Sequence, residues 1–345
     1  MPRAKLNDVA RHAGVSKSTA SRALNGVGEL SVQTREAVVR AAQVLDYRPS
    51  PVARSLRTRR SKTIGLVVPT VTHSFYAAVT NGAQMSLQDR GYRLILVDSG
   101  EDPETLTGAV LTLLDHEVDG ILMSTAPVGA DQFNALLDGT PCVFIDELAP
   151  GAGVGNVVLE NQRGMELLVD HIAGHGHRRI GFLGGPNNRT SGVERLHGFR
   201  EAMVRNGLDI EADLVGECEW TIASGFDHAR ALLALGRPPT ALITASGELA
   251  LGALVAARRA RVSIPGDLAL ACFDDLYFAP LLEPSLTSIA YDARAIGQDG
   301  ARLLLAAIEN DHAPWSEARI DVDLVCRRSC GCDHDPAAAL AEVLQ

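Results

Sequence analysis

The chain contains no apolar run that approaches the length of a membrane span, and no apolar core of signal-peptide length follows its N-terminus. These absences disfavour a membrane protein and a secreted protein. We therefore expect the protein to be cytoplasmic.

Two common nucleotide-binding signatures, the P-loop and the dinucleotide fingerprint, are also missing. No nucleophile–base pair and no metal triad stands out along the chain. The histidines of His175-Gly176-His177 flank an expected strand, where they more often serve a turn than bind a metal. The sequence therefore predicts a protein that is not an enzyme and has neither catalytic residues nor a cofactor.

The spacing of the six cysteines does not indicate a disulfide framework and is consistent with reduced thiols. Cys326, Cys330 and Cys332 cluster with His334 near the end of the chain and could in principle bind zinc. However, Cys-x3-Cys-x-Cys is not the usual paired spacing of a zinc site. We therefore expect no metal, an expectation that a chelator with no effect on stability would support.

The net charge of −10 is unevenly distributed along the 345 residues. Residues 1–62 contain 13 Lys/Arg and 4 Asp/Glu, a net charge of +9, and the remaining residues have a net charge of −19. A basic head on an acidic body suits a protein whose head alone contacts phosphates. For the body itself, acidic residues that only aid solubility are the simpler interpretation.

Residues 6–25 have the pattern of a helix-turn-helix. Apolar residues at 6, 9, 10 and 13, and again at 15, 20, 23 and 24, predict two short amphipathic helices interrupted at Gly14. Gly14 can adopt the positive φ that ends a helix, and Ser16 can cap the next one. The outer face of the second helix has Lys17, Ser18, Ser21 and Arg22, which can donate to base edges and phosphates.

A third helix follows, capped by Ser31, and we expect its buried stripe to contain Val38, Val39, Ala42 and Leu45. The prolines of Tyr47-Arg48-Pro49-Ser50-Pro51 end this unit. The sequence thus predicts an all-α DNA-binding domain over residues 1–50 and a basic hinge or linker over 51–62.

From Thr63 onward, strand-like and helix-like segments alternate, which predicts parallel α/β sheets. The first set has expected strands at 63–69, 92–97, 120–123 and 142–145 and expected helices near 75–89, 105–115 and 131–137. The second set begins after 156–159, with strands at 180–184, 240–244 and 268–273 and helices at 164–172, 192–206, 225–235 and 249–260. The body therefore has two Rossmann-like lobes.

The last helix, 293–308, fits the first lobe and the strand at 320–325 fits the second, so the chain crosses between lobes more than once, as in a hinge. We expect lobe 1 to contain residues 63–160 and 290–319, and lobe 2 residues 161–289 and 320–330. Residues 331–345 form a tail. Its segment 337–344 is too short for a tetramerising coiled coil, so a dimer is expected.

The segment from Leu6 to Pro69 closely resembles the LacI/GalR family of bacterial transcription regulators. The resemblance rests on motifs that include Asp8-Val9-Ala10, Ala13-Gly14-Val15-Ser16, Thr19-Ala20-Ser21-Arg22, Tyr47-Arg48-Pro49 and Ala53-Arg54-Ser55-Leu56. Further motifs, among them Arg195-Leu196-His197-Gly198-Phe199 and Phe273-Asp274-Asp275, extend it to about Cys330. The body of this family is similar to periplasmic sugar-binding proteins, with ligand between two lobes.

This resemblance implies a repressor, associated with the nucleoid, that binds a pseudo-palindromic operator under control of a sugar or sugar derivative. A regulator that responds to a nucleoside or a sugar acid remains an alternative. A solute-binding protein for transport would share the body, but the missing signal peptide and the basic head argue against it.

Residue roles in DNA binding follow from the second helix and from the family. We expect Lys17, Ser18 and Arg22 to read bases in the major groove, with Arg22 suited to guanine. Ser16, Thr19 and Asn25 would contact phosphates, although Ser16 could equally serve only as a helix cap. Leu6 is the remaining residue of the head that we expect to contact DNA. By resemblance, Leu56, beside Arg54, is the wedge of a hinge helix that opens a central pyrimidine–purine step, which requires a dimer.

Effector contacts are expected where loops leave the C-terminal ends of strands. By resemblance, these positions supply a stacking aromatic ring, an arginine for ligand oxygens and an aspartate for ligand hydroxyls. The candidates are Phe75, Tyr76, Asp146, Arg189, Ser191, Arg195, Trp220 and Asp274. Where many relatives have Asn-Asp, this chain has Ser246-Gly247-Glu248, which puts a plain hexose in the usual pose in doubt. Glu248 either substitutes for the missing carboxylate or faces solvent.

Overall fold

The computed structural model describes residues 4–47, 60–100, 102–125, 130–149, 151, 153, 155–310 and 316–333. The chain divides into two units, Met1–Lys62 and Thr63–Gln345. Predictions for Arg54, Leu56, His334 and residues 337–344 lie outside the described residues.

The first unit contains the helices α1 (Leu6–His12), α2 (Lys17–Asn25) and α3 (Val32–Val44). Gly14 has a φ of +67°, and Ser16 Oγ accepts a hydrogen bond from Thr19 N at 3.1 Å, so the predicted turn and cap are present. A small core joins the three helices through Val9, Ala10, Ala20, Ala23, Val38, Ala41 and Ala42. This is the expected all-α head.

One prediction for α3 is wrong. Val39 is 38% exposed, and Ala41 is buried in the head core instead. Residues 38, 41 and 42 share one face of a helix, whereas residue 39 lies about 100° around the axis from residue 38. Leu45 packs against the core but is only partly buried.

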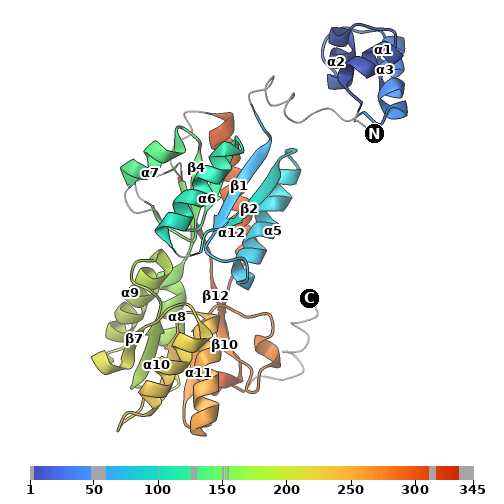
Figure 1. The fold of residues 1–345 in the computed structure, drawn as a ribbon. Coiled ribbons are helices and arrows are strands. Elements are labelled where there is room, and N and C mark those ends of the chain that lie inside the picture. Colours follow the sequence, from blue (N-terminus) through green and yellow to red (C-terminus); the bar gives the residue numbers. More distant parts are fainter. Residues whose placement is uncertain are drawn as a thin grey trace. The chain divides into compact units, whose positions relative to one another are not determined.

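Lobe 1 of the second unit is built on a parallel sheet with the strand order β11-β5-β4-β3-β1-β2. Its strands are β1 (Thr63–Val68), β2 (Arg93–Asp98), β3 (Gly120–Met123), β4 (Cys142–Ile145), β5 (Gly155–Leu159) and β11 (Ser316–Ile320). Helices α5 (Ser74–Gln88) and α12 (Ala293–Glu309) pack on one face, and α6 (Pro103–Asp115) and α7 (Ala130–Leu137) pack on the other (Figure 1).

Lobe 2 repeats this design with the order β12-β10-β9-β8-β6-β7, in which only the β10–β12 pair is antiparallel. Its strands are β6 (Ile180–Gly184), β7 (Val215–Glu217), β8 (Ala241–Thr244), β9 (Ala269–Phe273), β10 (Thr287–Ala290) and β12 (Asp323–Val325). Helices α8 (Asn161–Gly174) and α9 (Thr190–Arg205) cover one face, and α10 (Ile222–Leu233) and α11 (Gly247–Ala260) cover the other. Short 3₁₀ turns occur at η1 (Ala212–Leu214), η2 (Ala279–Leu281) and η3 (Arg328–Cys330).

The chain crosses between the lobes after β5, after β10 and after β11, which agrees with the expected hinge. The predicted strand at 320–325 is two strands, because Ile320 ends β11 in lobe 1 and only Asp323–Val325 joins lobe 2. All six cysteines are free thiols. No helix among the described residues is long and apolar enough to span a membrane.

Candidate functional site

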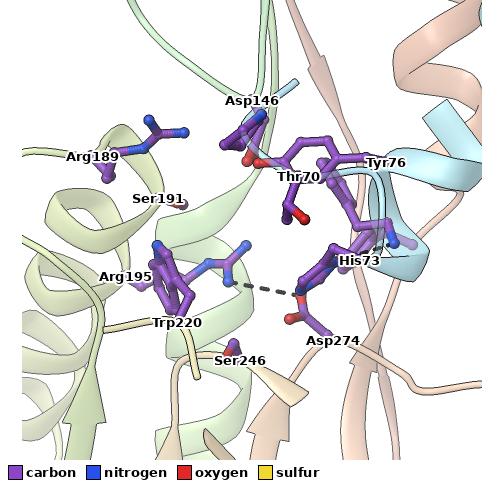
Figure 2. A pocket seen from close by; sticks show the side chains of 13 residues that line it. Thr70, His73, Tyr76, Asp146, Arg189, Ser191, Arg195, Trp220, Ser246 and Asp274 are labelled. Carbon is purple, nitrogen blue, oxygen red and sulfur yellow. Dashed lines mark hydrogen bonds and ion pairs between the residues drawn. The ribbon is translucent and has the colours of Figure 1, made fainter. Parts of the chain in front are cut away.

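A cavity lies between the two lobes, where the C-terminal ends of strands from both sheets meet. Figure 2 shows side chains from both lobes directed toward it. The cavity is lined by Pro69, Thr70, His73, Phe75, Tyr76, Asp146, Arg189, Ser191, Arg195, Trp220, Ser246, Asp274 and Tyr291. All eight residues predicted as effector contacts are in this set.

Arg195 and Asp274 form the polar centre of the lobe 2 wall. Arg195 Nη1 lies 3.7 Å from Asp274 Oδ1, which also accepts a hydrogen bond from Tyr291 Oη at 2.6 Å. Asp274 Oδ2 accepts a hydrogen bond from Gly247 N at 3.2 Å, at the start of α11. The carboxylate therefore caps a helix and faces the cavity at the same time.

The guanidinium of Arg195 is fixed from several sides. Its Nε donates to Asn161 Oδ1 at 2.8 Å and its Nη1 to the Ala245 carbonyl at 2.6 Å. Its Cζ lies 3.7 Å from the centroid of the Phe273 ring, and the residue is 5% exposed. A surface ion pair on its own helix, the simplest alternative for Arg195, is thus excluded.

Asp146 follows β4 on the lobe 1 wall and is 9% exposed. Its Oδ1 has no hydrogen-bond partner among the described residues. Burial raises the pKa of the Asp146 carboxyl to about 7, although the Arg195 charge opposes this change. An unpaired buried oxygen at a cavity wall can accept a hydrogen bond from a ligand.

Aromatic rings line both lobes of the cavity. The rings of Phe75 and Tyr76, from the start of α5, meet edge to face with centroids 5.0 Å apart. Trp220 follows β7 in lobe 2, and its ring lies against Gly185, where any Cβ would overlap it. Gly185 therefore allows the Trp220 ring to lie on the backbone that follows β6.

Arg189, predicted as a ligand contact, also joins the lobes. Its Nε lies 2.6 Å from Glu147 Oε1, and its Nη2 donates to the Ser124 carbonyl at 2.9 Å. Two further hydrogen bonds with Thr190 connect the same segments, from Leu148 N to Thr190 Oγ1 at 2.8 Å and from Thr190 N to Glu147 Oε2 at 3.0 Å. These contacts form the first inter-lobe bridge.

A second inter-lobe bridge joins His73 of lobe 1 to Glu248 of lobe 2, with 3.0 Å between Nε2 and Oε2. Although burial lowers the pKa of His73, the hydrogen bond and charge of Glu248 outweigh burial and raise it. Likewise, His73 lowers the pKa of Glu248 against the effect of burial. Glu248 is not among the residues that line the cavity, and its ion pair with His73 across the lobes is a contact that the sequence did not predict.

Sequence reasoning missed five of the residues that line the cavity: Pro69, Thr70, His73, Ser246 and Tyr291. Two of them have a local signal, because His73 Nδ1 accepts from Phe75 N at the start of α5, and Ser246 Oγ accepts from Leu249 N at the start of α11. A polar helix cap directly after a strand is thus a useful indicator here.

The outer face of α2 has the predicted donors. Lys17, Ser18 and Arg22 are exposed, and neither Lys17 nor Arg22 has an ion pair among the described residues. Ser16 Oγ lies 2.8 Å from both Ser18 Oγ and Thr19 Oγ1, and Asn25 Nδ2 donates to the Ser21 carbonyl at 2.6 Å. Leu6 packs partly buried against the head core.

Comparison with known proteins matches both units. Residues 5–50 match the family described as bacterial regulatory proteins, lacI family, and residues 169–330 match the periplasmic binding protein-like domain. The HTH-type transcriptional repressor CytR of Escherichia coli (strain K12) is 30% identical over 331 residues, which cover 94% of this chain and 96% of that protein.

Solved structures agree with these matches. The lac repressor dimer bound to operator and the anti-inducer ONPF has a TM-score of 0.86 at 27% identity, over 95% of this chain and 99% of that chain. The complex of the transcriptional regulator CelR with cellobiose has a TM-score of 0.72 at 31% identity, over 95% of this chain and 100% of that chain.

Proposed function

Because the chain belongs to the lacI family of bacterial regulatory proteins, we propose that it represses transcription by binding a pseudo-palindromic operator as a homodimer, under control of a sugar-like effector. As a member of this family it is a transcriptional regulator and not an enzyme. Its place of action is the cytoplasm, at the nucleoid.

DNA recognition is assigned to the exposed face of α2. Lys17, Ser18 and Arg22 contact bases, since their donors are exposed and the two cations are not engaged with carboxylates among the described residues. Ser16, Thr19 and Asn25 contact the phosphate backbone, and Leu6 is the remaining DNA-binding residue of the head. Arg54 and Leu56 enter the minor groove at the operator centre, where two copies of the chain meet.

The effector binds in the cavity between the lobes. The observation that carries this proposal is the placement of Arg195, Asp274 and the unpaired Asp146 Oδ1 around one cavity. Asp146 and Asp274 accept hydrogen bonds from ligand hydroxyls, and Arg195 donates to a ligand oxygen. Phe75, Tyr76 and Trp220 supply apolar faces, and Ser191 and Arg189 complete the set.

The charge around the cavity favours a neutral polyol over a sugar acid. Arg189 lies beside Glu147, and Arg195 lies beside Asp274. Asp146 adds a further acidic group that a ligand carboxylate would have to approach. Each of the two arginines among the described lining residues therefore already has a carboxylate beside it that neutralises its charge before a ligand binds.

Control of DNA binding would operate through closure of the lobes. The bridges Arg189–Glu147 and His73–Glu248 exist only when the lobes are together. A ligand that binds the closed form more tightly shifts the equilibrium between open and closed lobes toward the closed form. The coupling free energy between two binding sites of this kind is typically about 1–3 kcal/mol. The distance between the two heads of the dimer would then change, and with it their ability to bind both half-sites of the operator at once.

The direct test is a gel-shift titration on the DNA that flanks the gene, with random duplex as competitor. Calorimetry with neutral mono- and disaccharides, polyols, nucleosides and sugar acids identifies the ligand class. We expect selective DNA binding, and a change in DNA affinity only with neutral hydroxyl-rich compounds. Binding without sequence preference, with every compound present or absent, would refute the proposal.

A further inference from the structure

Four metal-ligating side chains meet in lobe 2, away from the residues that line the inter-lobe cavity. His171 lies in the last turn of α8 and His175 is the C-cap residue of this helix, whereas Cys330 and Cys332 come from the segment that follows β12. Their ligand atoms all lie within 4.8 Å of one another. Helix and segment are distant in sequence, so the cluster exists only in the folded lobe.

Three separations within this cluster are close to those of a tetrahedral metal site, and the widest of the six is no more than 4.8 Å. His171 Nε2 lies 3.2 Å from Cys330 Sγ and 3.7 Å from Cys332 Sγ, and His175 Nε2 lies 3.3 Å from Cys332 Sγ. A zinc ion with ordinary Zn–S and Zn–N bonds requires ligand atoms roughly 3.3–3.8 Å apart. Little rearrangement is therefore needed to accept an ion at its centre.

We propose that His171, His175, Cys330 and Cys332 bind one structural Zn²⁺ ion that fastens the end of lobe 2 to α8. Two thiolates and two imidazoles form a closed four-ligand set, which is typical of structural zinc and leaves no position for a substrate. Soft sulfur ligands disfavour Mg²⁺ and Ca²⁺. The site thus stabilises the fold and takes no part in effector binding.

Neighbouring groups already orient these ligands. Cys326 Sγ lies 3.8 Å from His171 Nδ1, the ring nitrogen that faces away from the site, and Thr287 Oγ1 donates to Cys330 Sγ at 3.0 Å. Such outer contacts fix the ring and the thiolate of a metal site.

The two thiols differ in acidity. Although burial raises the pKa of Cys330, hydrogen bonds from His171 and Thr287 outweigh it and lower this pKa to about 7. Burial and the neighbouring Cys330 raise the pKa of Cys332 to about 12.

The sequence alone did not indicate this site, because Cys330-x-Cys332 lacks the paired spacing of common zinc motifs. The other two ligands, His171 and His175, are four residues apart, a spacing that places them on one side of the helix end. This proposal therefore differs from the expectation, drawn from the cysteine spacing alone, that no metal binds here.

The test is elemental analysis of the full-length protein, purified reduced, incubated with Zn²⁺ and desalted. We expect about one equivalent of zinc per chain, and less than about a tenth of that in His175→Ala and Cys332→Ser. His197→Ala, which removes an exposed histidine on α9, is the matched control and should retain the ion. A strong chelator should lower the Tm of the wild type and of the control, but not that of His175→Ala.

Cobalt provides a readout that does not depend on the variants folding. Co²⁺ bound to the wild-type protein should show tetrahedral d–d bands and thiolate charge-transfer bands. Three results would overturn the proposal: no retained metal in the wild type, equal retention by the variants, or a disulfide that forms in air from thiols that never bind Co²⁺.

Discussion

Asp146 and Asp274 occupy equivalent positions in the two lobes, because each directly follows the fourth strand of its lobe, β4 or β9, and each has a positive φ, 60° or 80°. A positive φ is unusual for aspartate and concentrates at ligand sites. The two lobes therefore direct matching carboxylates into one cavity. Their surroundings differ, since Asp274 is fixed by Tyr291 and Arg195 whereas Asp146 Oδ1 has no partner among the described residues.

Replacing Asp274 should abolish most effector binding. In Asp274→Asn the charge beside Arg195 is lost, and the hydrogen bonds from Tyr291 and Gly247 weaken. We expect the effector Kd measured by calorimetry to rise about 100-fold, since a buried charged hydrogen bond contributes about 1.5–3 kcal/mol. Asp227→Asn, an exposed carboxylate on α10, serves as the control and should bind as the wild type does. Unchanged affinity in Asp274→Asn would remove Asp274 from the site.

Asp146→Asn should stabilise the ligand-free protein in a pH-dependent manner. The pKa of Asp146 is raised from 3.8 to about 7, so ionisation of this carboxyl is disfavoured in the folded state. The free-energy cost of ionising Asp146 in the folded protein is absent below pH 3.8, grows as pH rises, and reaches its full value above about pH 7. The gain in free energy of unfolding should reach about 1 kcal/mol or more at pH 8 and be smaller at pH 5, because one unit of pKa shift corresponds to about 1.4 kcal/mol. Denaturant melts at both pH values check this, and an equal gain at both would contradict it.

Glu248→Gln should remove a pH-dependent contribution to lobe closure. The pKa of His73 is raised above 6.5 and that of Glu248 is lowered below 4.5, so the pair is fully ionic between these values. Its stabilisation is lost as pH rises through the raised pKa of His73, and as pH falls through the lowered pKa of Glu248. We expect the free energy of unfolding of Glu248→Gln to be lower than that of the wild type by roughly 1 kcal/mol at pH 6, and this difference to shrink by pH 9.

The matched control for Glu248→Gln is Glu309→Gln, a carboxylate that pairs with Arg90 and not with a histidine. Thermal melts of both variants across the pH series provide the comparison. A deficit in Glu248→Gln that stays constant with pH would exclude His73 as the titrating partner.

The sequence predicted the arrangement of the cavity because it depends on local order. Strands that alternate with helices bring their carboxyl ends to one edge, so Asp146, Arg195 and Asp274 could be placed together. The pairing of His73 with Glu248 could not, since it arises from closure of two lobes. Strands β7, β10 and β11 were missed because their sequences, Val-Gly-Glu, Thr-Ser-Ile-Ala and Ser-Glu-Ala-Arg-Ile, contain no continuous apolar run. Val39 was misplaced because the buried face of α3 contains residues 38, 41 and 42, and residue 39 lies about 100° around the helix from residue 38, on the side away from residue 41.

Gly185→Ala should weaken effector binding by displacing the Trp220 ring. A Cβ at residue 185 would overlap this ring, which must therefore leave its place beside the cavity. We expect a loss of affinity similar to that in Trp220→Ala, roughly 10-fold or more, consistent with about 1.5 kcal/mol for a buried aromatic contact. Gly108→Ala on α6, where a Cβ would meet nothing within 4 Å, is the control and should bind normally. If Trp220→Ala lost affinity and Gly185→Ala did not, the supporting role of Gly185 would be wrong.

Arg22→Ala should reduce operator selectivity more than it reduces binding to random DNA. If Arg22 donates two hydrogen bonds to a guanine, its loss costs about 1–3 kcal/mol per half-site, or roughly 5–150-fold in affinity for a matched sequence. Lys17→Ala should likewise lose more affinity for the operator than for random duplex, and it should also reduce the salt dependence of binding because one cation fewer lies beside the phosphates. The control is Arg40→Ala on α3, an exposed arginine beside Glu36 that lies away from the α2 face. Competition gel shifts with the operator, with single-base variants and with random duplex distinguish these cases. A uniform loss across all three DNAs in Arg22→Ala would assign Arg22 to the phosphates instead of a base.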